Sequence, residues 1–144
     1  MLIGEFRHSL DAKKRVAIPA KMRKDLGEQA VITRGLDSCL FVYPQAEWAK
    51  LVEKLSQLPM GTLSTRSFVR FLLSGAQEAS LDQLGRILIP EYLRGYANLG
   101  KTVVVVGVHP RIEIWDAAIW DQFKSKAEGN ADELAEKLGE LGVY

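Results

Sequence analysis

An eleven-residue stretch, SLDAKKRVAIP at residues 9–19, recurs as SLDQLGRILIP at residues 80–90. Both copies place an aspartate four residues before an arginine, and both end in an apolar stretch followed by proline. The similarity continues at nearly the same offset, pairing Leu26-Gly27 with Leu99-Gly100, Gly35 with Gly107, and Trp48 with Trp120. Self-similarity at a fixed period indicates one structural unit that occurs twice.

Each copy predicts the same order of elements, ββαββ followed by a longer helix. The expected strands are residues 2–8, 15–18, 30–34 and 39–43 in the first copy, and 76–81, 86–89, 102–107 and 111–115 in the second. The expected longer helices are residues 45–57, 64–74, 117–126 and 130–141. Pro19 and Pro90 are predicted at the first position of two short helices, where the missing N–H costs no hydrogen bond.

One sheet unit of about 45 residues is marginal for a core of its own. The two copies are therefore predicted to interleave around a pseudo-two-fold axis. The expected fold class is α+β, a double-split β-α-β in which two ββαββ halves share one core, with added helices. The expected division is a first repeat at 1–57, a connecting helical segment at 58–75, a second repeat at 76–126 and a C-terminal helix at 127–144.

The composition describes an ordinary globular chain whose charge is unevenly placed. Its 144 residues are 47% hydrophobic and 26% charged, with a net charge of only +1. Residues 1–27 nevertheless hold seven Lys and Arg against three acids, whereas residues 116–144 hold three against seven. The basic segment is a candidate contact for a polyanion, and a merely solvated charged face is the alternative.

The repeated turn supplies the candidate binding residues. Asp11 and Asp82 are expected to accept hydrogen bonds from backbone N–H groups of the turn that follows each of them. Strand alternation then places Arg15 and Arg86 on the outer face, opposite the apolar residues beside them. A guanidinium fork suits phosphate or the O6 and N7 atoms of guanine. The alternative is that each arginine only pairs with the aspartate of its own turn.

The two turns differ at the residue before the arginine. Gly85 suits a turn that ends with a positive φ, and Lys14 occupies the equivalent position. If the backbones match, Lys14 is left-handed at a cost of about 1 kcal/mol relative to glycine. A functional role for the Lys14 cation is one explanation for a lysine at this position. A first turn with a different backbone shape is the other. Lys13 and Lys14 are added candidates for DNA contacts, with Arg7 and Lys21 as further phosphate contacts.

Enzymatic and cofactor chemistry has little support in the sequence. No glycine-rich phosphate loop, nucleophile motif or Cys/His metal spacing occurs. Cys39 is most simply a core residue, and His8 and His109 are most simply surface residues. No catalytic residue, metal, cofactor, small-molecule substrate or membrane span is expected. With one cysteine and no leader-like N-terminus, a cytoplasmic protein is expected.

A second candidate surface is the amphipathic stretch that contains Phe68, Phe71 and Leu72. Its apolar residues recur at helical spacing, which indicates a helix that packs on the sheet. The same stretch is the best candidate for a helix that also meets another subunit.

The residues of the repeat closely resemble the MraZ family of bacterial transcriptional regulators. The resemblance rests on GEFRHSLDAKKR at residues 4–15, on IPAKMR at 18–23 and on DQLGR at 82–86 followed by Ile89-Pro90 and Leu93-Arg94. It covers about residues 1–126, and Lys14 departs from the glycine that is usual before the first arginine.

The resemblance implies two SpoVT-AbrB-like domains in a ring-shaped homo-oligomer of about eight to twelve subunits. It implies a sequence-specific, nucleoid-associated regulator that binds short direct repeats in double-stranded DNA upstream of its own gene. That gene stands at the head of the division and cell-wall cluster, whose promoter the family usually represses. The implied DNA-binding residues are Asp11, Arg15, Asp82 and Arg86, with Lys13 and Lys14 as added cations.

Two other functions stay open from the sequence. One is an AbrB-like module that holds a partner protein, as in antitoxins, with the stripe around Phe68 as its contact surface. The other is a carboxylate-based enzyme, which would need a deep pocket holding an acid of raised pKa.

Overall fold

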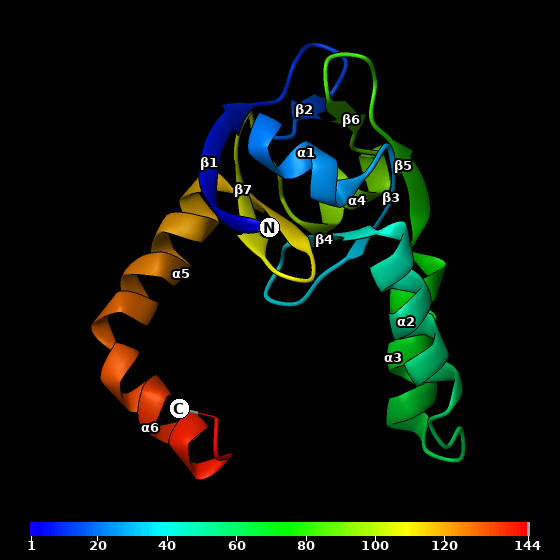
Figure 1. Ribbon diagram of the computed structural model, residues 1–144, viewed down its shortest axis with the longest axis vertical. Coiled ribbons are helices and arrows are strands. Elements are labelled where there is room, and N and C mark those ends of the chain that lie inside the picture. The colour runs from blue at the N-terminus through cyan, green and yellow to red at the C-terminus, as the bar shows by residue number, and fades with distance from the viewer. Residues whose placement is uncertain (144) are drawn as a thin grey trace.

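The computed structural model describes residues 1–143 and has the expected α+β architecture (Figure 1). The first half contains β1 (Ile3–Ser9), β2 (Arg15–Ala17), α1 (Ala20–Leu26), β3 (Gln29–Arg34), β4 (Leu40–Pro44) and α2 (Gln45–Ser56). A connecting helix, α3 (Leu63–Ser74), follows. The second half contains β5 (Gln77–Ser80), β6 (Arg86–Leu88), α4 (Glu91–Tyr96), β7 (Thr102–Val108), β8 (Ile112–Asp116), α5 (Ala117–Gly129) and α6 (Ala131–Glu140).

The two halves are interleaved, as the repeat predicts. The main sheet has the order β1-β7-β8-β4-β3-β5, so the first strand of each half pairs with the third strand of the other half. At the centre, β4 pairs antiparallel with β8. A separate two-stranded sheet joins β2 to β6 in antiparallel register, with Val16 opposite Ile87. Neither half could complete its sheet alone, because two strands of the other half separate its first strand from its third and fourth strands.

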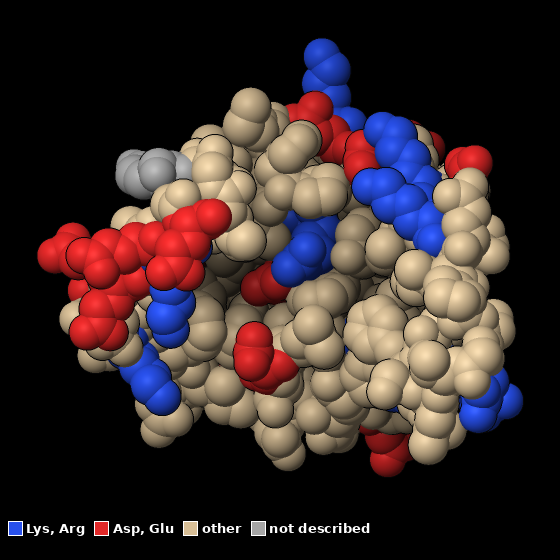
Figure 2. All heavy atoms as spheres, turned by 90° about the horizontal axis from the view of Figure 1, so that it is seen from below, with Lys and Arg blue, Asp and Glu red and all other residues tan. Residues whose placement is uncertain are grey.

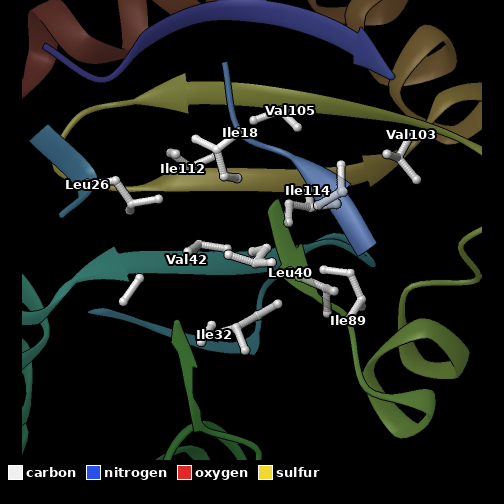
Figure 3. Close-up of a cluster of buried hydrophobic side chains, with 14 of the residues drawn as sticks. Ile18, Leu26, Ile32, Leu40, Val42, Ile89, Val103, Val105, Ile112 and Ile114 are labelled. Atoms are coloured by element: carbon white, nitrogen blue, oxygen red, sulfur yellow. The ribbon is translucent and has the colours of Figure 1, made fainter. Parts of the chain in front are cut away.

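One shared core fills the space between the main sheet and the β2–β6 pair. The alternating residues Val16, Ile18, Ile87 and Ile89 have no exposed surface and point into this core. Figure 3 shows Ile18 and Ile89, from the two halves, facing apolar side chains of the sheet strands. Residues that are adjacent to these side chains along β2 and β6 must therefore face outward.

The longer helices project from the opposite end of the molecule as two arms. Figure 1 shows α2 with α3 on one side and α5 with α6 on the other, both pointing away from the loops that precede β2 and β6. A second apolar cluster at the base of the arms contains Phe41, Tyr43 and Trp115, against which Trp48 and Trp120 pack. Figure 2 views this end and shows acidic side chains gathered on the α5–α6 side, where α6 carries Asp132, Glu133, Glu136 and Glu140.

The expected elements all occur, with boundaries that differ by at most three residues. The expected position of the two prolines is wrong by one residue. Pro19 and Pro90 precede the first helical residues and have extended backbones, with ψ of 135° and 153°. Their carbonyls still accept hydrogen bonds from Met22 and Leu93, so each proline supplies the helix cap. Residue 144, the end of the expected 127–144 segment, lies outside the described residues.

Candidate nucleic-acid interface

The two polar turns lie side by side at the end of the molecule opposite the arms (Figure 1). Pairing of β2 with β6 brings them together, because Arg15 begins β2 and Arg86 begins β6. The pairing extends into the turns themselves. The Ile18 N–H donates to the Gly85 carbonyl at 2.9 Å, and the Ile89 N–H donates to the Lys14 carbonyl at 3.0 Å. Each turn is thus fixed by the strand of the other half.

An aspartate shapes each turn in the way the sequence predicts. Asp11 Oδ1 accepts from the backbone N–H groups of Lys13 and Arg15, both at 2.9 Å. Asp82 Oδ1 accepts from the equivalent groups of Leu84 and Arg86 at the same distance. Since these donors stabilise the charged form, the backbone N–H of the following arginine, more than its guanidinium, lowers the pKa of each carboxyl below its ordinary value of 3.8.

The four charged side chains form one network across the pseudo-two-fold axis. Arg15 Nε donates to Asp11 Oδ2 at 2.8 Å, and Arg86 Nε donates to Asp82 Oδ2 at 2.9 Å. Each arginine also approaches the aspartate of the other turn: Nη1 of Arg15 lies 3.8 Å from Asp82, and Nη1 of Arg86 lies 3.6 Å from Asp11. Each arginine therefore pairs with the aspartate of its own turn, which is one of the interpretations that the sequence left open. Each also approaches the aspartate of the other turn, a contact that the sequence does not reveal.

This pairing leaves part of each guanidinium available. The side chains of Arg15 and Arg86 are 28% and 27% exposed. Within residues 1–143, their Nη1 and Nη2 groups make no hydrogen bond. The aspartate holds Nε, so the outer edge with its two terminal nitrogens can still make a bidentate contact. The arrangement presents two fixed forks pointing away from the core.

The predicted left-handed conformation of Lys14 is confirmed. Its φ is 63°, against 74° for the equivalent Gly85. Lys13 and Lys14 are both exposed and flank the network with two cations that the second turn lacks. The first turn therefore keeps the backbone shape of the glycine turn despite its side chain, and adds positive charge at the tip.

The two further phosphate-contact candidates have partners within the chain. Arg7 on β1 pairs with Asp121 of α5 at 2.7 Å, and that hydrogen bond raises the pKa of its guanidinium. Lys21 on α1 lies with its ammonium 4.7 Å from the centre of the Phe6 ring. The structure does not bring either side chain into the network of the two turns.

The candidate subunit contact on α3 is only partly open. Phe68 is 39% exposed, whereas Leu72 is 3% exposed and its carbonyl accepts a hydrogen bond from Thr33. Phe71 is half-buried, with Phe68 on one side and Tyr96 on the other. The side chain of Leu72 is thus buried by its own chain, and Phe68 is the residue of the three most open to a second chain.

Three basic residues beside the turns were missed by sequence reasoning. Arg23 of α1 lies over Gly85 and donates through Nε to the Ile18 carbonyl at 2.8 Å. Arg94 of α4 holds the equivalent place in the second half and donates to the Ile89 carbonyl. Lys101 accepts through its backbone carbonyl from Leu10, next to the first turn. Arg23 and Arg94 could have been found from the sequence, because they occupy equivalent positions in the two copies of the repeat. No feature of the sequence around Lys101 indicates that it lies beside the first turn.

The surroundings of the turns are shallow and polar. Three depressions of about 360 to 550 Å³ surround the network. No group of three or more His, Cys, Asp and Glu able to hold a metal ion occurs in residues 1–143. Within the same residues, no helix is long and apolar enough to cross a membrane. An open surface that carries paired cations suits a large polyanion better than a small molecule.

The fold and the paired turns define a class of protein: two interleaved ββαββ repeats that present one Asp-x-x-x-Arg turn from each half at a single surface. Comparison with known families gives the same answer. The family model described as "MraZ protein, putative antitoxin-like" matches residues 1–71 and again residues 72–140. The chain belongs to the MraZ family.

Similar proteins cover the full length of the chain. A protein of Natranaerobius thermophilus is 51% identical over 143 residues, which is 99% of this chain and all of that protein. Proteins of Desulforamulus reducens and Clostridium tetani are 49% and 48% identical, over 98% and 99% of this chain and 99% and 100% of their own lengths. All three are named transcriptional regulator MraZ.

Proposed function

We propose that this chain is a DNA-binding transcriptional regulator that recognises short direct repeats upstream of its own gene and represses that promoter. The DNA-binding residues are Arg15 and Arg86, held by Asp11 and Asp82, with the lysines of the first turn as added cations. The protein acts in the cytoplasm, at the nucleoid, and performs no catalysis. The repeats at 1–57 and 76–126, with the connecting segment 58–75 and the C-terminal segment 127–144, form one working unit.

The observation that carries the proposal is the pair of arginines held side by side on an exposed surface. A guanidinium whose Nε is fixed by a carboxylate loses little freedom when its terminal nitrogens bind O6 and N7 of guanine. A fixed fork also reads a base edge better than a mobile one, since the ordering cost has been met before binding. The carboxylates therefore act as positioning groups for the two arginines.

Charge placement supports the same orientation on DNA. The turns lie at one end of the molecule and the acidic α6 arm lies at the other (Figures 1 and 2). The net charge of +1 thus hides a basic surface at the turns and an acidic α5–α6 arm, whereas α2 and α3 together carry four Lys and Arg against two acids. Phosphates attract the turns and repel the α5–α6 arm, so the turns approach the duplex. Both arms project from the opposite end of the molecule and therefore face away from the duplex (Figure 1).

Arms that face away from DNA are free to join subunits. In this proposal Phe68 contributes to contacts that close a ring of about eight to twelve subunits, as the family resemblance implies. One unit with few base contacts binds weakly, whereas several linked units gain about 10²- to 10⁴-fold through effective concentration. The spacing of the DNA repeats must then match the spacing of neighbouring subunits.

The test is a mobility-shift titration of the full chain with the duplex upstream of its own gene, repeated at two salt concentrations. We expect saturable binding that falls steeply with salt and exceeds binding to a scrambled duplex of equal length. Binding without salt dependence, or without preference for the upstream duplex, would contradict the proposal. Capture of another protein by a chain that fails to bind DNA would favour the antitoxin-like alternative.

A further inference from the structure

Two depressions flank the pair of turns and are related by the pseudo-two-fold axis. The first-turn depression has a volume of about 500 Å³ and is lined by Asp11, Lys14, Arg94 and Lys101 among others. The second-turn depression has a volume of about 550 Å³ and is lined by Asp82, Arg23, Lys24 and Glu28 among others. Each combines the turn of one half with the short helix of the other half. The DNA surface therefore has two flanks of similar shape.

The two flanks carry opposite charges at one equivalent position. The Leu10 N–H, just before the first turn, donates to the Lys101 carbonyl at 2.8 Å. The Leu81 N–H, just before the second turn, donates to the Glu28 carbonyl at the same distance. Lys101 and Glu28 follow the equivalent residues Gly100 and Gly27, so the backbone is repeated while the charge is reversed.

The aspartates do not offset the cations in either depression. Asp11 and Asp82 are both occupied by the arginines and backbone donors of their own turns. The first-turn depression thus keeps three cations without a free carboxylate, and the second keeps two cations beside Glu28. Lys14 and Lys101 are exposed, and neither forms an ion pair within the described part of the chain.

Side-chain packing maintains the difference. A Cβ atom at position 85 would lie 2.1 Å from Arg23 Nε, so a side chain there would displace Arg23 from its hydrogen bond to the Ile18 carbonyl. Lys14 occupies the equivalent position in the first turn, and its exposed ammonium adds to the positive charge of that flank. The positive charge is therefore concentrated on the flank that Lys14 and Lys101 share.

We propose that the first-turn depression is a phosphate-binding subsite for the DNA backbone and that the second-turn depression is not. The inference rests on the proposed function and adds that each subunit contacts the backbone on one flank of the base pairs that Arg15 and Arg86 read. Lys14, Arg94 and Lys101 form no ion pair within residues 1–143, and three such cations around one hollow suit the oxygens of a single phosphate, since each contact is charge-assisted. In the second-turn depression Glu28 stands in place of Lys101, and its negative charge offsets the attraction of the two cations there for a phosphate.

The test compares Lys101→Gln with Lys24→Gln in the full chain, on the duplex upstream of its own gene. Both substitutions remove one exposed cation from a depression beside a turn, so they make the same change in charge. The measurement is the slope of log Kobs against log salt concentration. We expect Lys101→Gln to reduce the magnitude of the slope by about 0.9 for each subunit engaged, the value for one neutralised phosphate. Lys24→Gln should leave the slope unchanged.

A third variant, Glu28→Lys, copies the first-turn charge to the other flank and should increase the slope by a similar amount. Equal slopes for Lys101→Gln and Lys24→Gln, or no effect of Lys101→Gln, would overturn the subsite while leaving the proposed function intact. Failure of the unmodified chain to bind DNA would overturn both. Circular dichroism on each variant shows that the fold is retained.

Discussion

Arg15 pairs with Asp11 four residues before it and at the same time lies 3.8 Å from Asp82, which belongs to the other half of the chain. Arg86 makes the reciprocal pair of contacts. The two turns therefore share their charges as one network, and a change in either turn alters the electrostatics of both. The predictions for the turns follow from this coupling.

Replacing either arginine should weaken specific recognition without unfolding the chain. We expect Arg15→Ala and Arg86→Ala each to weaken binding to the upstream duplex by roughly 5- to 150-fold, the range for one bidentate base contact. Arg15→Lys is the control, since it keeps the charge and loses the fork. Unchanged affinity in both alanine variants, measured by mobility shift, would exclude these residues as base contacts.

Replacing Lys14 should separate stability from binding. Lys14→Gly relieves a left-handed φ of 63° and should raise the free energy of unfolding by about 1 kcal/mol, while weakening DNA binding through the lost cation. Gly85→Ala is the matched change in the other turn and should destabilise the chain, because its Cβ would meet Arg23. Urea denaturation measures both, and a Lys14→Gly chain that is less stable would contradict the assigned turn geometry.

Stability should fall as the solution becomes acidic. The pKa values of Asp11 and Asp82 are lower in the folded chain than in the unfolded chain. At acidic pH the unfolded chain therefore binds more protons than the folded chain, and stability falls as the pH falls. The stabilisation is complete above the ordinary aspartate value of 3.8 and is lost as the pH falls through the lower folded values. The midpoint of thermal unfolding, measured between pH 6 and pH 2, should fall less steeply with decreasing pH in the double variant Asp11→Asn/Asp82→Asn than in the unmodified chain. The same fall of the midpoint with pH in both chains would show that protonation of the network is not coupled to folding.

A charge on the exposed part of α3 should reduce the size of the assembly. Phe68 is 39% exposed, so Phe68→Lys should disrupt a subunit contact there while keeping the fold. Phe68→Leu is the conservative control. Light scattering on the purified chain should show smaller particles for the lysine variant and reduced binding to multi-repeat DNA, with binding to one repeat retained. Unchanged particle size would place the subunit contact elsewhere.

The elements of the fold could be predicted because their signals are local. Alternating apolar residues indicate the strands, helical spacing indicates α2 and α3, and the aspartate and glycine of each turn indicate its shape. Even the left-handed Lys14 follows from comparison with Gly85, since a repeated sequence implies a repeated backbone. The burial of Leu72 could not be predicted, because an amphipathic pattern does not tell which edge of the apolar stripe its own chain covers.

The sequence by itself determined that the chain is a duplicated ββαββ unit whose turns carry Asp-x-x-x-Arg, because these properties depend on residues close together along the chain. Only the tertiary structure decided that β2 pairs with β6, that Arg15 approaches Asp82 and that Lys101 joins the first turn. Those contacts join segments far apart in the sequence, and burial of a core that neither half completes alone brings them together. The proposed binding surface is therefore a product of interleaving, because its residues come from both halves of the chain.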